Sequence, residues 1–263
     1  MNRLSLFAIF LLCGLSVFAI PAFLIDPYRI LYMIAVTVVL LVTYLYAKKG
    51  GGLQEYLQIL LAFFIASLAF LLQIYWSAGD TIEGIVSNKL ISTVIVVTTI
   101  VLIVGLSSGN LSELYLKRGN LRQGVLIGVI VIIIFAVTAI PFSIWLFGGQ
   151  EVTAERLLAL IPWIAVFVSL NGIKEELLFR GLFLKKYENF FGLDRANVLQ
   201  AVIFASAHLQ PSFSITTVIL FMLPLFLGLG FGAVMQKTDS LLGAILCHAG
   251  ADIPYMLAVF SYL

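Results

Sequence analysis

The feature that most constrains this chain is a series of long apolar runs that fills most of its length. Runs long enough to cross a bilayer occur nine times, at 4–25, 30–47, 57–76, 91–107, 124–147, 157–184, 196–212, 214–236 and 240–262. Hydrophobic residues make up 62% of the chain and charged residues 11%, whereas an ordinary soluble domain has about a quarter charged residues. We therefore expect an all-α fold, a polytopic transmembrane helical bundle with about 8–9 spans that has the lipid bilayer as a partner.

The lysines and arginines predict how this bundle is oriented. With nine spans the loops alternate between two sides, and the N-terminal side collects ten basic residues: Arg3, Lys48, Lys49, Lys117, Arg118, Arg122, Lys185, Lys186, Arg195 and Lys237. The other side collects three, namely Arg29, Lys89 and Arg156. Because basic loops stay in the cytoplasm, we expect an integral protein of a prokaryotic plasma membrane with a cytoplasmic N-terminus. The small, scattered net charge of +2 gives no indication of a nucleic-acid partner.

The chain divides by the distribution of its polar residues. The runs within 1–150 are nearly free of ionisable groups, and we interpret them as N-terminal transmembrane helices of unassigned role. The ionisable groups are in 151–263, which we interpret as the helical core that carries the chemistry. Within this core Gly228 and Gly232 form a small-xxx-small pair, which predicts close helix packing in the run 214–236.

Seven ionisable residues lie within or near the membrane depth of the last four runs: Lys174, Glu175, Glu176, Arg180, His208, His248 and Asp252. Each charge at the centre of a bilayer costs about 2.5–3.5 kcal/mol on insertion scales, so such residues usually face a cavity and carry function. Both histidines of the chain belong to this group. We therefore expect these residues to share one cavity.

The spacing of the carboxylates separates their roles. Glu176 and Arg180 are four residues apart on one helical face, which favours a structural ion pair. Glu175 points about 100° away from Glu176 and has no such helical partner, which makes it a candidate general base. His248 and Asp252 are also four apart, a spacing that suits either a buried hydrogen bond between helices or a reactive pair.

Three motifs occur in order on successive apolar segments: E-E-x-x-x-R (Glu175, Glu176, Arg180), F-x-x-x-H (Phe204, His208) and H-x-x-x-[N/D] (His248, Asp252). Together they resemble the CPBP family, which comprises CAAX-type prenyl endopeptidases (type II) and ABI-like bacteriocin-processing or immunity proteins. The resemblance covers about 155–262, and 1–150 adds only its membranous character.

The resemblance implies an intramembrane endopeptidase that cleaves a membrane-associated peptide or lipidated protein, with its site open toward the cytoplasmic side. It implies that Glu175 activates water with the help of His208, that His248 and Asp252 stabilise the oxyanion, and that Glu176 and Arg180 support this geometry. An ionised Asp252 cannot donate a hydrogen bond, so it is either protonated or only orients His248. We favour the second interpretation.

Three alternatives stay open. The resemblance favours a glutamate mechanism without a cofactor, but zinc is possible, because Glu175, His208 and His248 are competent zinc ligands and family members have been labelled metalloproteases. The motif H-E-x-x-H is absent. The intramembrane residues could also form the proton relay of a transporter, or belong to a non-catalytic bacteriocin-immunity protein. The lack of internal symmetry and the presence of every motif residue favour the protease.

Overall fold

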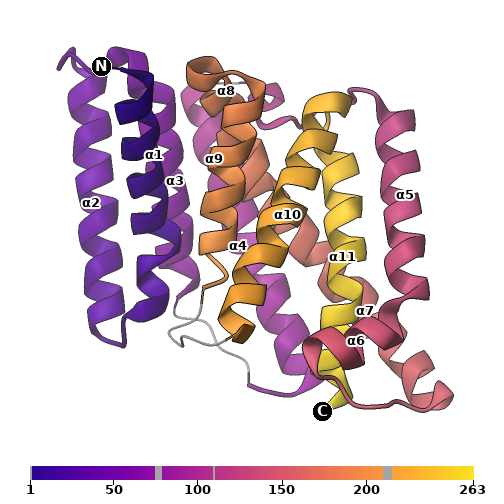
Figure 1. Ribbon diagram of the computed structural model, residues 1–263. Coiled ribbons are helices and arrows are strands. Elements are labelled where there is room, and N and C mark those ends of the chain that lie inside the picture. The colour runs from indigo at the N-terminus through magenta and orange to yellow at the C-terminus, as the bar shows by residue number, and fades with distance from the viewer. Residues whose placement is uncertain (1, 75–78, 109, 210–214) are drawn as a thin grey trace.

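The computed structural model describes residues 2–74, 79–108, 110–209 and 215–263. The regular elements in these ranges are all helical: α1 (Arg3–Phe18), η1 (Ile20–Phe23), α2 (Tyr28–Lys48), η2 (Gln54–Tyr56), α3 (Leu57–Gln73), α4 (Ile82–Ser108), η3 (Leu111–Leu114), α5 (Leu121–Val137), α6 (Ala139–Phe147), α7 (Ala154–Glu175), η4 (Glu176–Leu184), α8 (Lys185–Phe191), α9 (Leu193–Ser206), α10 (Ile215–Thr238) and α11 (Leu241–Ser261). The predicted all-α polytopic bundle is confirmed (Figure 1).

In the described part of the chain, fewer helices qualify as spans than the eight or nine that the runs predict. Within the described ranges six helices are long and apolar enough to cross a membrane, or seven if the bent pair α5 and α6 counts as one span. Helices α1 and α9 have 16 and 14 residues, below the roughly 20 that a span needs, although both run alongside the longer helices (Figure 1). The predicted run ends at 75–76 and 210–212 lie outside the described residues.

Two predicted runs have different shapes from those expected. The run 124–147 forms α5 and α6, which meet at an angle of 68° near Thr138. Pro141 lies in the first turn of α6, where its missing N–H removes no helical hydrogen bond. The run 157–184, in contrast, belongs to a longer helix, because α7, η4 and α8 together form a 38-residue apolar span from Ala154 to Phe191.

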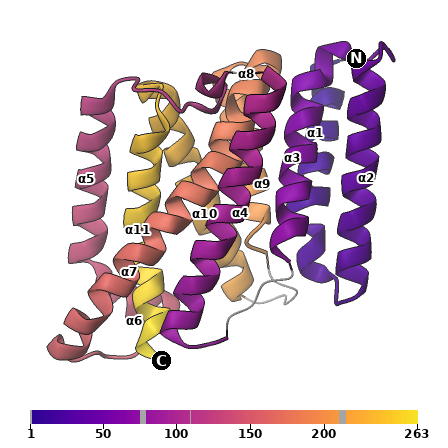
Figure 2. The same cartoon turned by 180° about the vertical axis from the view of Figure 1, so that it is seen from behind.

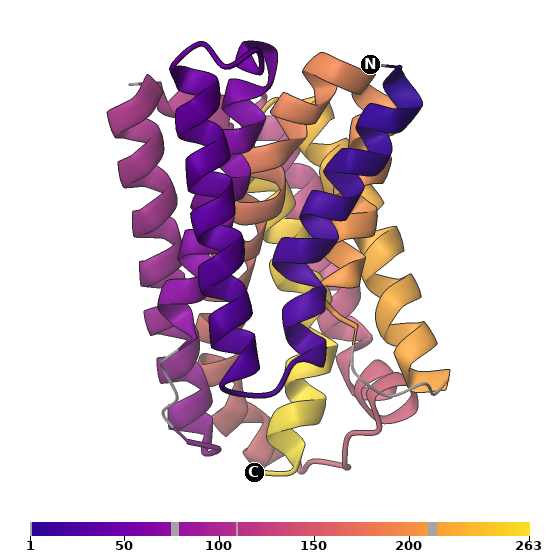
Figure 3. The same ribbon diagram turned by 90° about the vertical axis from the view of Figure 1, so that its left-hand side faces the viewer.

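The bundle has two distinct ends. The N-terminus, α8 and the connections α4–α5 and α10–α11 lie at one end, and α6 and the C-terminus lie at the other (Figures 1 and 3). By the helix bounds, the ten basic residues assigned to one side all fall at the N-terminal end. A salt bridge between Lys117 and Asp239 ties two connections together there, and the N–H of Asn120 donates to the carbonyl of Thr238. The orientation of these ends in a membrane stays a prediction.

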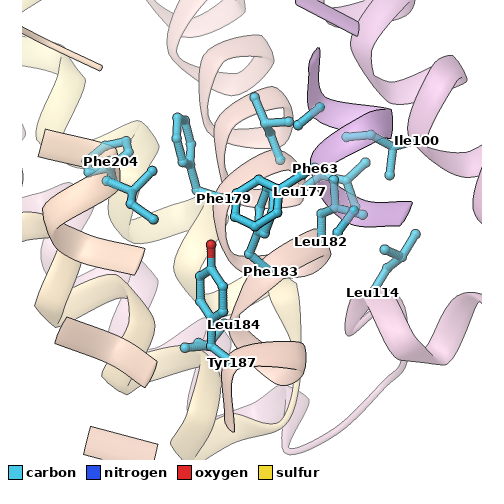
Figure 4. Close-up of a cluster of buried hydrophobic side chains, with 14 of the residues drawn as sticks. Phe63, Ile100, Leu114, Leu177, Phe179, Leu182, Phe183, Leu184, Tyr187 and Phe204 are labelled. Atoms are coloured by element: carbon cyan, nitrogen blue, oxygen red, sulfur yellow. The ribbon is translucent and has the colours of Figure 1, made fainter. Parts of the chain in front are cut away.

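The largest hydrophobic core surrounds η4, a π-helical segment. Its Phe179, Leu182 and Phe183 are almost fully buried (Figure 4). The ring of Phe179 lies 4.8 Å from that of Phe18 in α1, and the ring of Phe183 lies 5.0 Å from that of Phe63 in α3. Helices α1–α3 thus form one flank of the bundle, with α1 and α3 packed on η4, while α5 and α6 form the other flank (Figure 2).

Glycines bring α7 and α10 close to their neighbours. A Cβ atom at Gly172 of α7 would lie 2.9 Å from a backbone carbonyl oxygen of α11. On α10, a Cβ atom at Gly232 would overlap Asn197 of α9, and the carbonyl of Gly228 accepts a 3.0 Å hydrogen bond from Gln200. The close packing that Gly228 and Gly232 predict is therefore present between α10 and α9.

Candidate active site

The six ionisable residues of the three motifs lie together in the interior of the bundle. They come from four segments: Glu175 from the end of α7, Glu176 and Arg180 from η4, His208 from the turn after α9, and His248 and Asp252 from α11. The π-helical segment begins directly after Glu175, and π-helical turns within α-helices are frequent at functional sites.

A buried ion pair forms the base of the site. The Nη1 atom of Arg180 donates to Oε1 of Glu176 at 2.8 Å, and both side chains are fully buried. The guanidinium lies over the ring of Phe204 at 4.2 Å and near that of Phe231 at 5.5 Å. Two guanidinium nitrogens have no hydrogen-bond acceptor among the described residues. The π faces of the two rings therefore supply part of the stabilisation of the buried cation. The structural pairing that the spacing of Glu176 and Arg180 predicts is present.

His248 connects this ion pair to the cavity. Its Nδ1 atom lies 2.6 Å from Oε1 of Glu176, so Nδ1 carries the hydrogen whenever that carboxylate is ionised. Its ring stacks on Phe231 at 5.1 Å, which fixes the plane of the imidazole. Its Nε2 atom faces the opposite way, 3.7 Å from Oε2 of Glu175 and 3.6 Å from Oδ2 of Asp252.

Glu175 and His208 face each other across a short gap. The Oε2 atom of Glu175 is buried, has no hydrogen-bond partner among the described residues, and lies 4.0 Å from Nε2 of His208. The Nδ1 atom of His208 lies 2.8 Å from the carbonyl oxygen of Phe204, which can only accept a hydrogen bond. Nδ1 is therefore the donor, and in the neutral ring Nε2 keeps a lone pair that faces Glu175.

Glu175, His208, His248 and Asp252 line one wall of a cavity of about 430 Å³, whereas Glu176 and Arg180 are not among its lining residues. The rest of the wall is mainly apolar and aromatic, with Phe147, Phe167, Leu223, Leu227 and Tyr255 among its residues. Phe147 ends α6 and Tyr255 lies in the last third of α11, so the cavity extends from the ionisable cluster toward the end of the bundle that holds the C-terminus. The opening toward the cytoplasmic side that the resemblance implies stays a prediction.

Two further polar residues join the cluster, and the motifs include neither. Asn171, one turn before Glu175, donates from Nδ2 to Oδ2 of Asp252 at 2.7 Å. Its Oδ1 atom accepts from Nζ of Lys89 in α4, also at 2.7 Å. The four-residue spacing of Asn171 and Glu175 was a weak signal. Lys89 gave none, because the run 91–107 begins after it, whereas α4 begins at Ile82.

The residues of the zinc alternative, Glu175, His208 and His248, have suitable donor atoms. Across the described ranges, no three His, Cys, Asp or Glu side chains are arranged to hold a metal ion. Instead, Nε2 of His208 and Nε2 of His248 both face the same oxygen of Glu175. Zinc stays an alternative that elemental analysis can decide.

Comparison with known proteins identifies one family. The family described as Rce1-like, type II CAAX prenyl endopeptidase Rce1-like, matches residues 157–254. This segment contains Asn171 and all seven motif residues but excludes Lys89, and the match confirms the resemblance that the three motifs indicate. No curated protein and no solved structure matches the chain at a significant level.

Proposed function

We propose that this chain, which matches the family described as Rce1-like type II CAAX prenyl endopeptidase over residues 157–254, cleaves a membrane-associated peptide with water that Glu175 activates. The observation that carries this mechanism is the environment of Oε2 of Glu175. This oxygen is buried at the cavity, lacks a hydrogen-bond partner among the described residues, and faces two histidine nitrogens. A carboxylate with a free oxygen at such a position is suited to hold a water molecule and to take its proton.

In the first step the water lies between Glu175 and His208. The 4.0 Å gap between Oε2 and Nε2 is too long for a direct hydrogen bond, and a water that donates to both atoms bridges it. The water oxygen then forms a bond to the carbonyl carbon of the substrate. Its proton passes to Glu175, and the π electrons of the carbonyl become the lone pair of the oxyanion.

His248 is the group that stabilises the oxyanion. In its imidazolium form it donates from Nε2, while Glu176, held by Arg180, accepts from Nδ1 on the other side of the ring. Asp252 only accepts hydrogen bonds when ionised, so it orients His248 and the Asn171 amide. Donors aimed in advance at the developing charge are usually the largest contribution to the rate. The C–N bond then breaks, and the amine leaves with the proton that Glu175 took.

The cavity suits a short apolar peptide segment. Its volume of about 430 Å³ is that of an ordinary small-ligand pocket, and its wall is polar only around the ionisable cluster. A peptide bond presented there by an apolar tail would meet Glu175 and His248 while the tail contacts aliphatic and aromatic side chains. We therefore propose lipidated CAAX-type tails and other membrane peptides as the substrate class.

The zinc alternative gives a direct prediction. We expect the purified protein in proteoliposomes to cleave a prenylated CAAX peptide, with the fragments identified by mass spectrometry. We expect the initial rate to stay within about twofold after exhaustive treatment with a strong chelator, because the water is activated by a carboxylate and not by a metal. Elemental analysis of the same sample should find zinc well below one ion per chain.

A zinc protease treated in parallel serves as the control for the chelation. Stoichiometric zinc, together with activity that chelation abolishes and added zinc restores, would overturn the glutamate mechanism. The same peptide without its prenyl group, and an unrelated membrane peptide, measure whether the lipid is required.

A further inference from the structure

Lys89 contacts the active site from outside the segment that matches the family. It lies in the third turn of α4, and its Nζ atom donates to Oδ1 of Asn171 at 2.7 Å. Its ammonium also lies 4.7 Å from the centre of the ring of Phe167, one turn before Asn171 on α7. One turn further along α4, the hydroxyl of Thr93 donates to the carbonyl of Leu170 at 3.3 Å. Two polar contacts thus fix α4 against the end of α7.

The chemistry of this contact determines which way the Asn171 amide faces. An ammonium group only donates hydrogen bonds, so it selects the oxygen of the amide. The amide nitrogen must then face the other side, where it lies 2.7 Å from Oδ2 of Asp252 and 3.4 Å from Nε2 of His248. Without the cation, the amide oxygen would lose its partner, and only Asp252 would hold the orientation of the side chain.

Lys89 also adds positive charge to a cluster that contains three carboxylates. The carboxylates of Glu175, Glu176 and Asp252 lie around one imidazole, and Arg180 pairs with Glu176 alone. Lys89 reaches the Asp252 side of the site through the amide and lines the same cavity, while Lys174 interacts with Glu175 and Asp252 as a second cation.

We propose that Lys89 is a positioning residue of the active site, which fixes the Asn171 amide so that this amide holds Asp252 beside His248. The proposal rests on the proposed function, since it assigns Lys89 a part in the same reaction. It also gives the helices before residue 150 a role in catalysis, through α4.

The test is Lys89→Met in the full chain, in proteoliposomes with the cleavable peptide. Methionine keeps much of the length and apolar contact of the side chain but removes the donor. We expect kcat to fall about 10- to 100-fold with KM within about twofold, the size of effect that a small misplacement of reacting groups produces.

Lys89→Arg keeps the donor and should recover part of the lost kcat. Arg156→Met removes an exposed cation near the start of α7 and should leave both constants unchanged.

A double-mutant cycle distinguishes positioning from an independent effect. Because Lys89 acts through Asn171, the double variant Lys89→Met with Asn171→Leu should have the same kcat as Asn171→Leu alone. Losses that multiply would overturn the proposal. A second result would also overturn it: Lys89→Met raises KM without changing kcat, and does so for peptides with a free C-terminal carboxylate but not for the corresponding carboxamides. Lys89 would then bind the substrate.

The failure of this inference is distinguishable from that of the proposed function. If Lys89→Met has wild-type kcat while Glu175→Gln is inactive, only the positioning role is wrong. If Glu175→Gln is fully active, the proposed mechanism fails whatever Lys89 does. If size-exclusion chromatography shows that Lys89→Met does not fold, Lys89→Arg and Asn171→Leu test the positioning role instead. A wild-type kcat in Asn171→Leu would contradict the proposal.

Discussion

Glu175→Gln should lower kcat for peptide cleavage by about 10²- to 10⁴-fold, the range that general-base catalysis contributes. Glutamine has nearly the same shape and keeps an oxygen that can accept a hydrogen bond, but it cannot take a proton from water. The Oε2 atom of Glu175 has no hydrogen-bond partner among the described residues, so the substitution breaks no hydrogen bond of that atom. The measurement is the initial rate in proteoliposomes, followed by mass spectrometry, with thermal unfolding recorded on the same samples.

Glu155→Gln is the matched control, because Glu155 is an exposed carboxylate in the first turn of the same helix α7. It should have wild-type rates. Glu176→Gln differs from both, since it weakens contacts to Arg180 and His248 and should lower the yield of folded protein as well as the rate. Full activity in Glu175→Gln would end the proposed mechanism.

Arg180→Met should cost about 3–5 kcal/mol of stability, the largest loss we expect from any single substitution in the site. Arg180 and Glu176 are both fully buried, and removal of the cation leaves the Glu176 carboxylate without its guanidinium partner in the bundle interior. The rings of Phe204 and Phe231 would also lose the cation that they face. The free energy of unfolding in mixed micelles, titrated with a denaturing detergent, measures this loss.

The double variant Glu176→Leu with Arg180→Met separates charge burial from catalysis. It removes both charges at once, so much of the stability should return, as is often found when a buried ion pair is replaced by apolar residues. Activity should not return, because Nδ1 of His248 loses its carboxylate acceptor. A double variant that is as unstable as Arg180→Met would contradict the role of the pair as mutual neutralisation.

The sequence predicted the helical class because apolar runs of span length leave few other folds. It did not predict where helices break. The run 124–147 was expected to be one span, whereas it forms α5 and α6, with Pro141 in the first turn of α6. Likewise α1 ends before Pro21, so the predicted first run overestimates the length of its helix.

The site was predictable where a charge at membrane depth is costly, and this criterion found Glu175, His208 and His248. Asn171 carries no charge, so the same criterion gave no indication of its role. Lys89 was counted as a loop residue because polar residues precede the run 91–107, whereas packing against α7 extends α4 over these residues. Such tertiary contacts join parts of the chain that are 82 residues apart, and no local pattern reports them.

The direction of the cavity determines on which side of the membrane the cleavage products would be released. The ionisable cluster is deep in the bundle, and the residues that line the cavity lead from it toward α6 and the C-terminus. The basic loops lie at the opposite end of the bundle from α6 (Figure 1). Whichever compartment borders the α6 end would supply the water that is consumed and receive the soluble fragment that is released. If the basic loops face the cytoplasm, the α6 end borders the outer compartment. Cleavage would then act on substrates whose scissile bond enters the membrane from the outer side.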